Sequence, residues 1–359
     1  MDLKDFGSGL LFQLTRLSTL EDTKEAYPIE KQGSSKQIKR RFVTVASRQF
    51  HYIFAGSGPP VILLHSSPKT SMELAPLVQH LSQHFTAICF DTPGYGFSDG
   101  LEIEAPEIGD YADAMAEAVA ALKIKSVPIY GRHTGALIAY EIIRRRPGLF
   151  NAAVFDGFPM FTREEGQDFL DNYLPEFVPQ WDGTHLIAIW ARARQNYMTF
   201  PWYRNKKSNR TNMTLPEPQL LNETVIDILR ANYGYGHSYK AAFRYVPPQS
   251  MQELTFPTLF MAKKNDLICG HLDRLPKLPD SCVIERVSGE NIEWAQRIES
   301  FFMENSASEN QTDLPGALEI AKGITQRYTD VDGFQLLFRE IGGRSISPPP
   351  AQALQALHL

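Results

Sequence analysis

The sequence is poor in cysteine and contains no long apolar run. Its three cysteines, Cys89, Cys269 and Cys282, have no CxxC spacing, which argues against a disulfide framework or a structural zinc site and favours a reducing compartment. No apolar stretch reaches the roughly 20 residues that cross a bilayer. Residues 1–30 lack the basic-then-apolar layout of a signal peptide. We therefore expect a cytoplasmic protein without a membrane partner.

The chain also lacks a strong excess of charge and the common cofactor motifs. It carries 36 Lys and Arg against 41 Asp and Glu, a formal net charge of -5, which gives no electrostatic basis for binding nucleic acid. No Walker loop, no GxGxxG loop after the first expected strand and no cluster with metal-ligand spacing is present. These absences favour a small-molecule substrate at a site with no cofactor and no metal. They leave the oligomeric state open.

The sequence does contain a regular alternation of buried strands and helices. Continuous apolar runs separated by helical stretches are typical of a parallel sheet that is covered on both faces. The apolar runs lie at residues 61–64, 86–90, 127–130, 152–155, 258–262 and 282–287, with helical stretches at 74–85, 111–122, 136–145 and 292–302. An antiparallel pair at 40–55 precedes them. The pattern predicts an α/β fold with a doubly wound, mostly parallel sheet.

The composition changes along the chain predict a core with additions. We assign residues 1–39 to an N-terminal extension and residues 40–157 and 249–304 to the α/β core. Residues 158–248 are rich in aromatics, Pro and Asn and contain helical stretches but no buried-strand run, which indicates an inserted, mostly helical lid. One lid helix, at 186–198, has an apolar stripe that we assign to packing.

Residues 305–359 begin with a polar linker and then repeat the opening of the domain. Residues 327–343 match residues 41–57 at identical offsets, with Arg41, Phe42, Val45, Gln49 and Gly56 aligned with Arg327, Tyr328, Val331, Gln335 and Gly342. Residues 353–358 are weakly similar in sequence to the first apolar run at residues 61–64. The match indicates the truncated start of a second copy, and chance similarity between two amphipathic hairpins is the alternative. Such a hairpin either docks on the core or stays mobile, because alone it cannot bury its apolar face.

Three motifs in one order resemble those of the α/β-hydrolase family. His65-Ser66-Ser67-Pro68 follows the first apolar strand and is similar to the HGxP oxyanion loop, with Ser66 in place of the usual glycine. Residues 91–98, Asp-Thr-Pro-Gly-Tyr-Gly-Phe-Ser, resemble the family's D-x-P-G-x-G-x-S turn. Residues 131–135, Gly-Arg-His-Thr-Gly, resemble its nucleophile elbow. The resemblance covers residues 40–302 and implies a sheet of α/β-hydrolase type with a lid.

The resemblance also implies positions for the catalytic groups. His133 stands where the family carries serine, aspartate or cysteine, and Asp266 stands at the acid position. No histidine follows the last strand, where Glu290 occupies the expected place. The oxyanion donors would be the backbone N–H groups of Ser67 and Thr134. The ordinary serine–histidine–acid mechanism is therefore excluded.

The remaining groups support more than one function. A ring at His133 held by Glu290, with Asp266 behind it, would act as a general base or as a nucleophile on an ester, lactone or carbonyl compound. Hydrolysis and cofactor-free carbon–carbon cleavage are both compatible with this pair. The alternative is an inactive binding protein that keeps only the fold. His237, in a glycine-rich part of the lid, either contacts the substrate or is a surface residue, and His65 is assigned to support of its loop.

Overall fold

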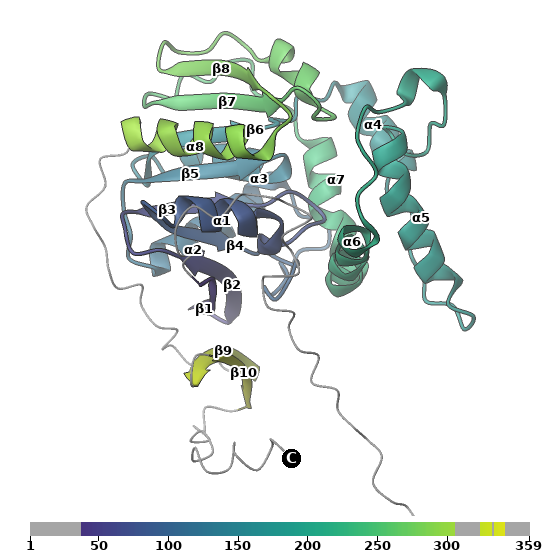
Figure 1. Cartoon of the computed structure of the whole chain (residues 1–359), viewed down its shortest axis with the longest axis horizontal. Helices are drawn as coiled ribbons and strands as arrows, with labels where there is room; N and C mark the ends of the chain where they lie inside the picture. Colours follow the sequence, from purple (N-terminus) through teal and green to yellow (C-terminus); the bar gives the residue numbers. More distant parts are fainter. Residues whose placement is uncertain (1–36, 306–323, 332–333, 342–359) are drawn as a thin grey trace, which may run out of the picture.

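The computed structural model describes residues 37–305, 324–331 and 334–341, and its core is a sheet of eight strands (Figure 1). The strand order is β1-β2-β4-β3-β5-β6-β7-β8. The strands are β1 (Lys39–Val45), β2 (Arg48–Ala55), β3 (Pro60–Leu64), β4 (Thr86–Phe90), β5 (Val127–Arg132), β6 (Phe150–Asp156), β7 (Thr258–Lys263) and β8 (Cys282–Val287). β1 and β2 pair antiparallel with their neighbours, and all other pairs are parallel. The predicted fold class is confirmed.

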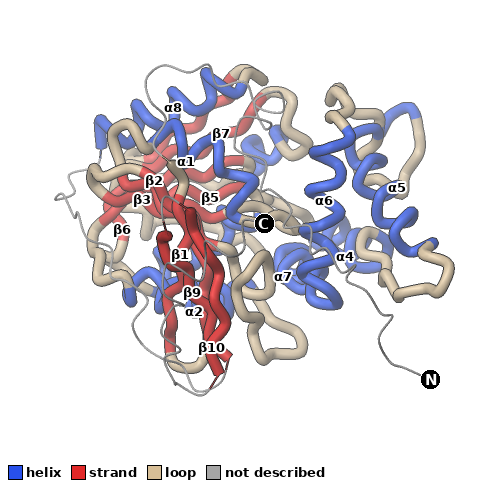
Figure 2. Tube along the Cα trace, turned by 60° about the horizontal axis from the view of Figure 1, so that its bottom comes forward, coloured by secondary structure: helices blue, strands red, loops and turns tan. Residues whose placement is uncertain are grey.

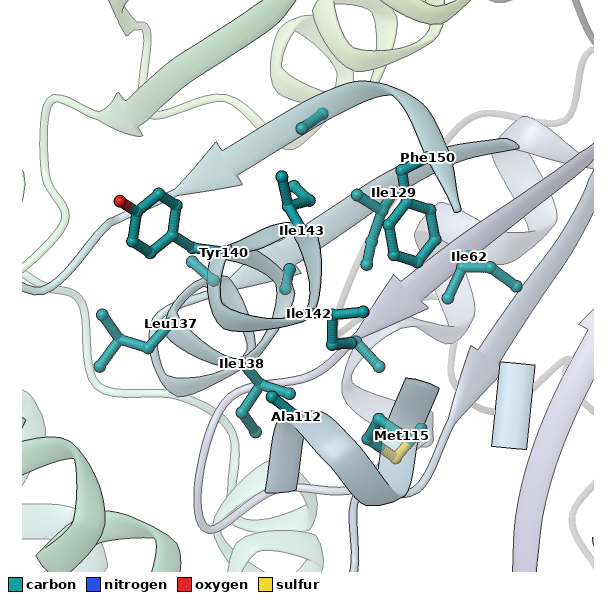
Figure 3. Packing of buried hydrophobic residues seen from close by; sticks show 14 of the residues in the cluster. Ile62, Ala112, Met115, Ile129, Leu137, Ile138, Tyr140, Ile142, Ile143 and Phe150 are labelled. Atoms are coloured by element: carbon teal, nitrogen blue, oxygen red, sulfur yellow. The ribbon is translucent and has the colours of Figure 1, made fainter. Parts of the chain in front are cut away.

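Helices cover both faces of the sheet, because its central strands are apolar on both sides. α2 (Ile108–Ala121) and α3 (Thr134–Arg145) pack on one face, and α1 (Ala75–Leu81) and α8 (Asn291–Asn305) pack on the other. Figure 3 shows the first of these layers, where Ile138 and Ile142 of α3 lie beside Ala112 and Met115 of α2. This packing fixes α3, and therefore the turn that leads into it, against the sheet.

Four further helices lie between β6 and β7, and we refer to residues 158–248 as the lid. They are α4 (Arg163–Asn172), α5 (Thr184–Met198), α6 (Pro218–Ala231) and α7 (His237–Arg244). Short 3-10 helices occur at Ser71–Leu74, Lys207–Asn209, Asn232–Gly236 and Cys269–Arg274. Because the lid follows the carboxyl end of β6, it stands over that end of the sheet, at the right of Figure 1. The buried faces of α5 and α6 pack on each other around Ile189, Val225 and Ile228.

A separate hairpin lies beside the edge strand of the main sheet. β9 (Ile324–Val331) and β10 (Phe334–Ile341) pair antiparallel, and Figure 2 shows them next to β1. The Phe42 and Tyr328 rings stack with centroids 5.7 Å apart. These two residues are aligned in the internal repeat, so the hairpin contacts the segment that it resembles.

Glutamine side chains join the two hairpins in a reciprocal way. The Gln335 side chain accepts a hydrogen bond from the backbone N–H of Arg40 at 2.6 Å and donates to its carbonyl at 3.3 Å. Gln49 makes the same two bonds to the backbone of Gln326, at 2.6 and 3.0 Å. Gln49 and Gln335 are aligned in the repeat, and so are the two backbone positions. The expected linker, most of the N-terminal extension, Gly342 and residues 353–358 lie outside the described residues.

Candidate active site

The turn between β5 and α3 holds His133 in a strained conformation. His133 has φ 46° and ψ -113°, in a region that side chains other than glycine rarely adopt. The neighbouring glycines make this turn sterically feasible. A Cβ at Gly131 would lie 2.4 Å from the carbonyl oxygen of Gly135, and a Cβ at Gly135 would lie 2.4 Å from that of Leu64. The turn is therefore a sharp, strained connection from β5 to α3 with histidine at its apex, and we refer to it as the elbow.

The His133 ring is held by Asp266, which lies in the loop after β7. Nε2 of His133 and Oδ2 of Asp266 are 2.9 Å apart, and Oδ1 of Asp266 accepts a hydrogen bond from the N–H of Ile268 at 2.9 Å. The Asp266 side chain is 4% exposed, whereas that of His133 is 28% exposed. The carboxylate is thus fixed inside the protein, and the ring reaches the surface of a cavity.

Gly157, immediately after β6, provides the space that this ring needs. Its φ is +63°, and a Cβ there would lie 2.4 Å from Cδ2 and 2.6 Å from Nε2 of His133. A histidine at an elbow that is usually occupied by a smaller side chain therefore depends on the absence of a side chain at residue 157. In the sequence, residue 157 marks only the end of the first core segment, although a glycine directly after a core strand indicates close approach of another group.

The electrostatics of the pair favour a charged carboxylate and a basic imidazole. Burial disfavours the imidazolium, but the charge of Asp266 and the hydrogen bond to it outweigh burial, so the pKa of His133 is raised above its ordinary value of 6.5. Burial also opposes ionisation of Asp266, yet His133, Arg132 and the Ile268 N–H hold the pKa of Asp266 well below its usual range. At neutral pH, the Asp266 carboxylate is therefore ionised and accepts a hydrogen bond from Nε2–H of His133.

A buried ionic network supports the elbow from below. The Arg132 guanidinium lies 3.3 Å from Asp156, 3.6 Å from Glu73 and 3.6 Å from Asp266. The same oxygen of Asp156 accepts hydrogen bonds from the Tyr130 hydroxyl at 2.7 Å and from Nε1 of Trp294 at 2.9 Å. Asp156 thus balances charge beneath the elbow and does not contact the His133 side chain through a hydrogen bond.

The two expected oxyanion donors lie at the same cavity as His133. Thr134 is the first residue of α3, and the N–H groups of a first helical turn have no carbonyl partner within the helix. Ser67 lines the same cavity, and its hydroxyl is 2.5 Å from that of Ser238 in the lid. Ser66 is turned toward Glu73, since both its N–H and its hydroxyl donate to that carboxylate. Ser66 therefore anchors the loop that carries Ser67.

The structure places Glu290 and His237 away from these groups. Glu290 is exposed, its N–H donates to the hydroxyl of Ser288, and Asp266 occupies the place at the His133 ring that we had expected for Glu290. His237 begins α7 and lines a different hollow beside Gly94 and Asp99. The His133 side chain is long enough to reach Asp266 directly, so Asp266 makes the hydrogen bond to the ring that we had expected from Glu290.

His65 lies under its own loop. Nδ1 of His65 is 2.8 Å from the carbonyl oxygen of Ser66, and Nε2 accepts a hydrogen bond from the N–H of Thr92 at 2.9 Å. Both ring nitrogens are used within the protein, and the side chain is 1% exposed. This arrangement fits the expected supporting role.

A cavity of about 190 Å³ separates the core from the lid. The core contributes Ser67, His133, Thr134 and Ile268, and the lid contributes mainly aromatic side chains: Phe161, Tyr173, Tyr197, Phe200, Tyr239 and Phe243. A mostly apolar pocket with a few polar groups is typical of sites for small molecules. Across the ranges that the structure describes, no group of three His, Cys, Asp or Glu side chains is arranged to hold a metal ion. In the same ranges, no helix combines the length and apolar character that a membrane crossing requires.

Comparison with known proteins identifies relatives of this fold. The profile of the α/β hydrolase fold matches residues 59–285. The chain is 30% identical over 112 residues to the (E)-2-((N-methylformamido)methylene)succinate hydrolase of Acinetobacter baylyi, covering 31% of this chain and 42% of that protein. It is 28% identical over 137 residues to a fluoroacetate dehalogenase of Burkholderia, covering 36% and 45%. The chain thus spans less than half the length of these curated relatives.

A solved structure agrees with the fold. The crystal structure of an epoxide hydrolase from Vigna radiata superposes with a TM-score of 0.53 and 18% identity, over 76% of this chain and 98% of that chain. At this identity the likeness concerns the fold alone. Since the family profile covers more than half of the chain, the chain belongs to the α/β-hydrolase fold family.

Proposed function

We propose that this chain is a hydrolase for a small to medium, partly apolar ester, lactone or carbonyl compound, and that His133 is its catalytic residue. The observation that carries the proposal is the hydrogen bond from His133 to the buried Asp266 at the wall of the lid cavity. A ring that merely filled the elbow would not need a buried carboxylate partner. The proposed site uses no cofactor and no metal.

The protonation of the pair favours His133 as a general base. Because Nε2 carries the proton that faces Asp266, Nδ1 holds the lone pair of the neutral ring. Nδ1 takes a proton from a water molecule while the water oxygen attacks the substrate carbonyl carbon. The imidazolium, stabilised by Asp266, then returns that proton to the leaving oxygen. Direct attack by Nδ1, which would give an acyl-imidazole that water hydrolyses, is the alternative use of the same ring.

The elbow and the oxyanion loop provide the second element of this mechanism. The N–H of Thr134 at the start of α3 and the N–H of Ser67 would donate to the carbonyl oxygen as it becomes negative. The positive end of the α3 dipole adds to this stabilisation. Ser66 and Glu73 hold the loop, so the donors are positioned before the substrate binds.

Turnover of a panel of p-nitrophenyl esters and lactones tests the proposal. We expect kcat/KM to fall by about 10²–10⁴-fold in His133→Ala, the range that a general base contributes. His84→Ala is the matched control, since His84 is half-exposed and pairs with Glu299 on α8. Absence of any turnover that depends on His133 would refute the proposal and favour a non-catalytic binding protein. Cleavage of β-diketones alone would favour the carbon–carbon lyase.

The state of the cysteines bears on the compartment in which the protein works. Cys89, Cys269 and Cys282 are all free thiols. Free thiols fit a reducing compartment, so we infer that the protein works in the cytoplasm. Mass spectrometry of the natural protein, with thiols alkylated before lysis, tests this inference, and a disulfide between any two of them would contradict it.

A further inference from the structure

Arg192, on lid helix α5, is a buried cation at the same cavity as His133. Its side chain lines the cavity, and the residue is only 3% exposed. Two of its guanidinium nitrogens, Nε and Nη2, have no hydrogen-bond partner among the described residues. A buried, unpaired charge lowers the free energy of unfolding, so an arginine at such a position is expected to have a role other than stabilising the fold.

The surroundings of Arg192 stabilise a cation but leave its Nε and Nη2 atoms without a hydrogen-bond acceptor among the described residues. The guanidinium carbon lies 5.2 Å from the ring centre of Tyr173, 5.8 Å from that of Tyr235 and 6.0 Å from that of Tyr239. Aromatic faces attract a guanidinium without accepting its in-plane hydrogen bonds. In contrast, lid arginines 204 and 244 are more exposed, and each pairs with a carboxylate at 2.7 Å.

The free donors have a shape that selects their partner. Nε–H and one N–H of Nη2 point in parallel from the same edge of the guanidinium plane. This edge matches the two oxygens of a carboxylate, which it binds through two parallel hydrogen bonds. Two oxygens of a phosphate match this edge as well, so competition by inorganic phosphate separates the two anions.

The rest of the cavity also favours an anion. None of the described residues that line it is acidic, and Lys69 and Asn196 add polar groups next to Arg192 and the oxyanion loop. The Lys69 ammonium donates to the hydroxyl of Thr224, also at the cavity. A ligand carboxylate would therefore meet positive charge and no acidic side chain of the lining.

We propose that Arg192 binds a carboxylate of the substrate, so that the substrates are carboxylic acids that also carry a hydrolysable ester, lactone or ketone group. The proposal rests on the proposed hydrolase function for the second group only. With the carboxylate at α5, the neutral carbonyl would lie toward the elbow, between His133 and the oxyanion donors. Arg192 is then a binding and specificity residue, and His133 remains the reactive one.

Binding of succinate, with succinamide as the neutral counterpart, tests the carboxylate site without requiring turnover. We expect calorimetry to detect succinate but not succinamide, and to show about 100-fold weaker succinate binding in Arg192→Met. Arg192→Lys, which keeps the charge but loses the parallel donors, should weaken it about 10-fold. Arg194→Met is the matched control, because Arg194 is exposed on the same helix. Equal succinate binding by all variants, no succinate binding by the wild type, or a preference for inorganic phosphate would overturn the proposal.

Stability separates a binding role from a structural one. If Arg192 is held for a ligand, Arg192→Met should melt at the same or a higher temperature than the wild type in the absence of succinate, because an unpaired buried charge is replaced by an apolar chain. A marked fall in melting temperature with unchanged succinate binding would assign Arg192 to packing instead. Arg192→Lys provides the binding measurement if the methionine variant does not fold.

Kinetics then distinguish the two proposals. For monoethyl succinate, Arg192→Met should raise KM with little change in kcat, whereas hydrolysis of diethyl succinate should be nearly unaffected. Failure of His133-dependent turnover with retained, Arg192-dependent succinate binding would refute only the hydrolase function. Turnover of diethyl succinate in preference to the half-ester would refute only the carboxylate site.

Discussion

Replacing Gly157 with alanine tests the central contact of the site. A Cβ at this position would lie 2.4 Å from Cδ2 and 2.6 Å from Nε2 of His133, distances that real Cβ atoms do not show. The backbone of residue 157 is held by a hydrogen bond from its N–H to the carbonyl of Met261 at 2.7 Å. The ring must therefore move, and it loses the hydrogen bond to Asp266.

Two costs add up in this variant. A left-handed backbone costs a residue other than glycine about 1–2 kcal/mol. Loss of a hydrogen bond to a charged group costs about 1.5–3 kcal/mol, and the partial exposure of His133 places it near the lower end. We expect Gly157→Ala to lower the free energy of unfolding by about 2.5–4 kcal/mol in total, or about 10 °C in melting temperature for a domain of this size.

Gly183→Ala is the control that isolates the backbone cost. Gly183 has φ +74°, and a Cβ there meets nothing within 4 Å. Denaturant unfolding should show a loss of only about 1–2 kcal/mol for Gly183→Ala. An NMR titration should show the pKa of His133 falling in Gly157→Ala alone, because the carboxylate that raises it is lost. Equal stability losses and an unchanged His133 pKa would refute the reasoning.

Three further perturbations have expected outcomes. Asp266→Asn should lower the pKa of His133, because the carboxylate charge that raises it is removed. In a plot of kcat/KM against pH, activity falls in acid where the ring becomes protonated, and this fall should move to lower pH in the variant. A fall that does not move would exclude His133 as the base. Asp91, which accepts hydrogen bonds from buried groups, has a pKa below its ordinary 3.8, so its stabilisation is complete above that pH and is lost as pH falls further. Urea unfolding of Asp91→Asn against pH should be flatter in acid than that of the wild type, and parallel curves would contradict this. Gln49→Ala and Gln335→Ala should each weaken docking of the β9–β10 hairpin by about 1–2 kcal/mol. Hydrogen exchange should show faster exchange of the β9 amides in both variants. Faster exchange in only one variant would contradict the reciprocal contact.

The sheet and the elbow were predictable because their signals are steric and local. Apolar runs between helices specify buried parallel strands, and the glycines at 131 and 135 are required wherever a strand turns sharply into a helix over the edge of the sheet. The strands and helices of the α/β core lie within a few residues of the predicted ranges, whereas lid helices α4 and α7 had no predicted range. Spacing along the chain was sufficient for these features.

The partners of the site were less predictable, because they depend on side-chain reach and on distant backbone. Glu290 was placed by analogy of position, but His133 extends to Asp266 through the space at Gly157. Arg192 lies on the apolar stripe of α5, three residues after Ile189, and that stripe suggested packing. An arginine within an apolar stripe was the sequence signal for a buried charge. That its Nε and Nη2 atoms lack a hydrogen-bond partner can be seen only in the folded structure.

The reciprocal glutamine contacts make the junction between the two hairpins nearly isologous. Each hairpin offers the other the same amide and the same backbone groups, as two identical subunits do about a two-fold axis. One chain here supplies both halves, and its hairpin packs beside the edge strand β1 of its own main sheet. A hairpin from a second copy of the chain would satisfy the same hydrogen bonds. The covalent connection gives the chain's own hairpin a high effective concentration, which favours the contact within one molecule.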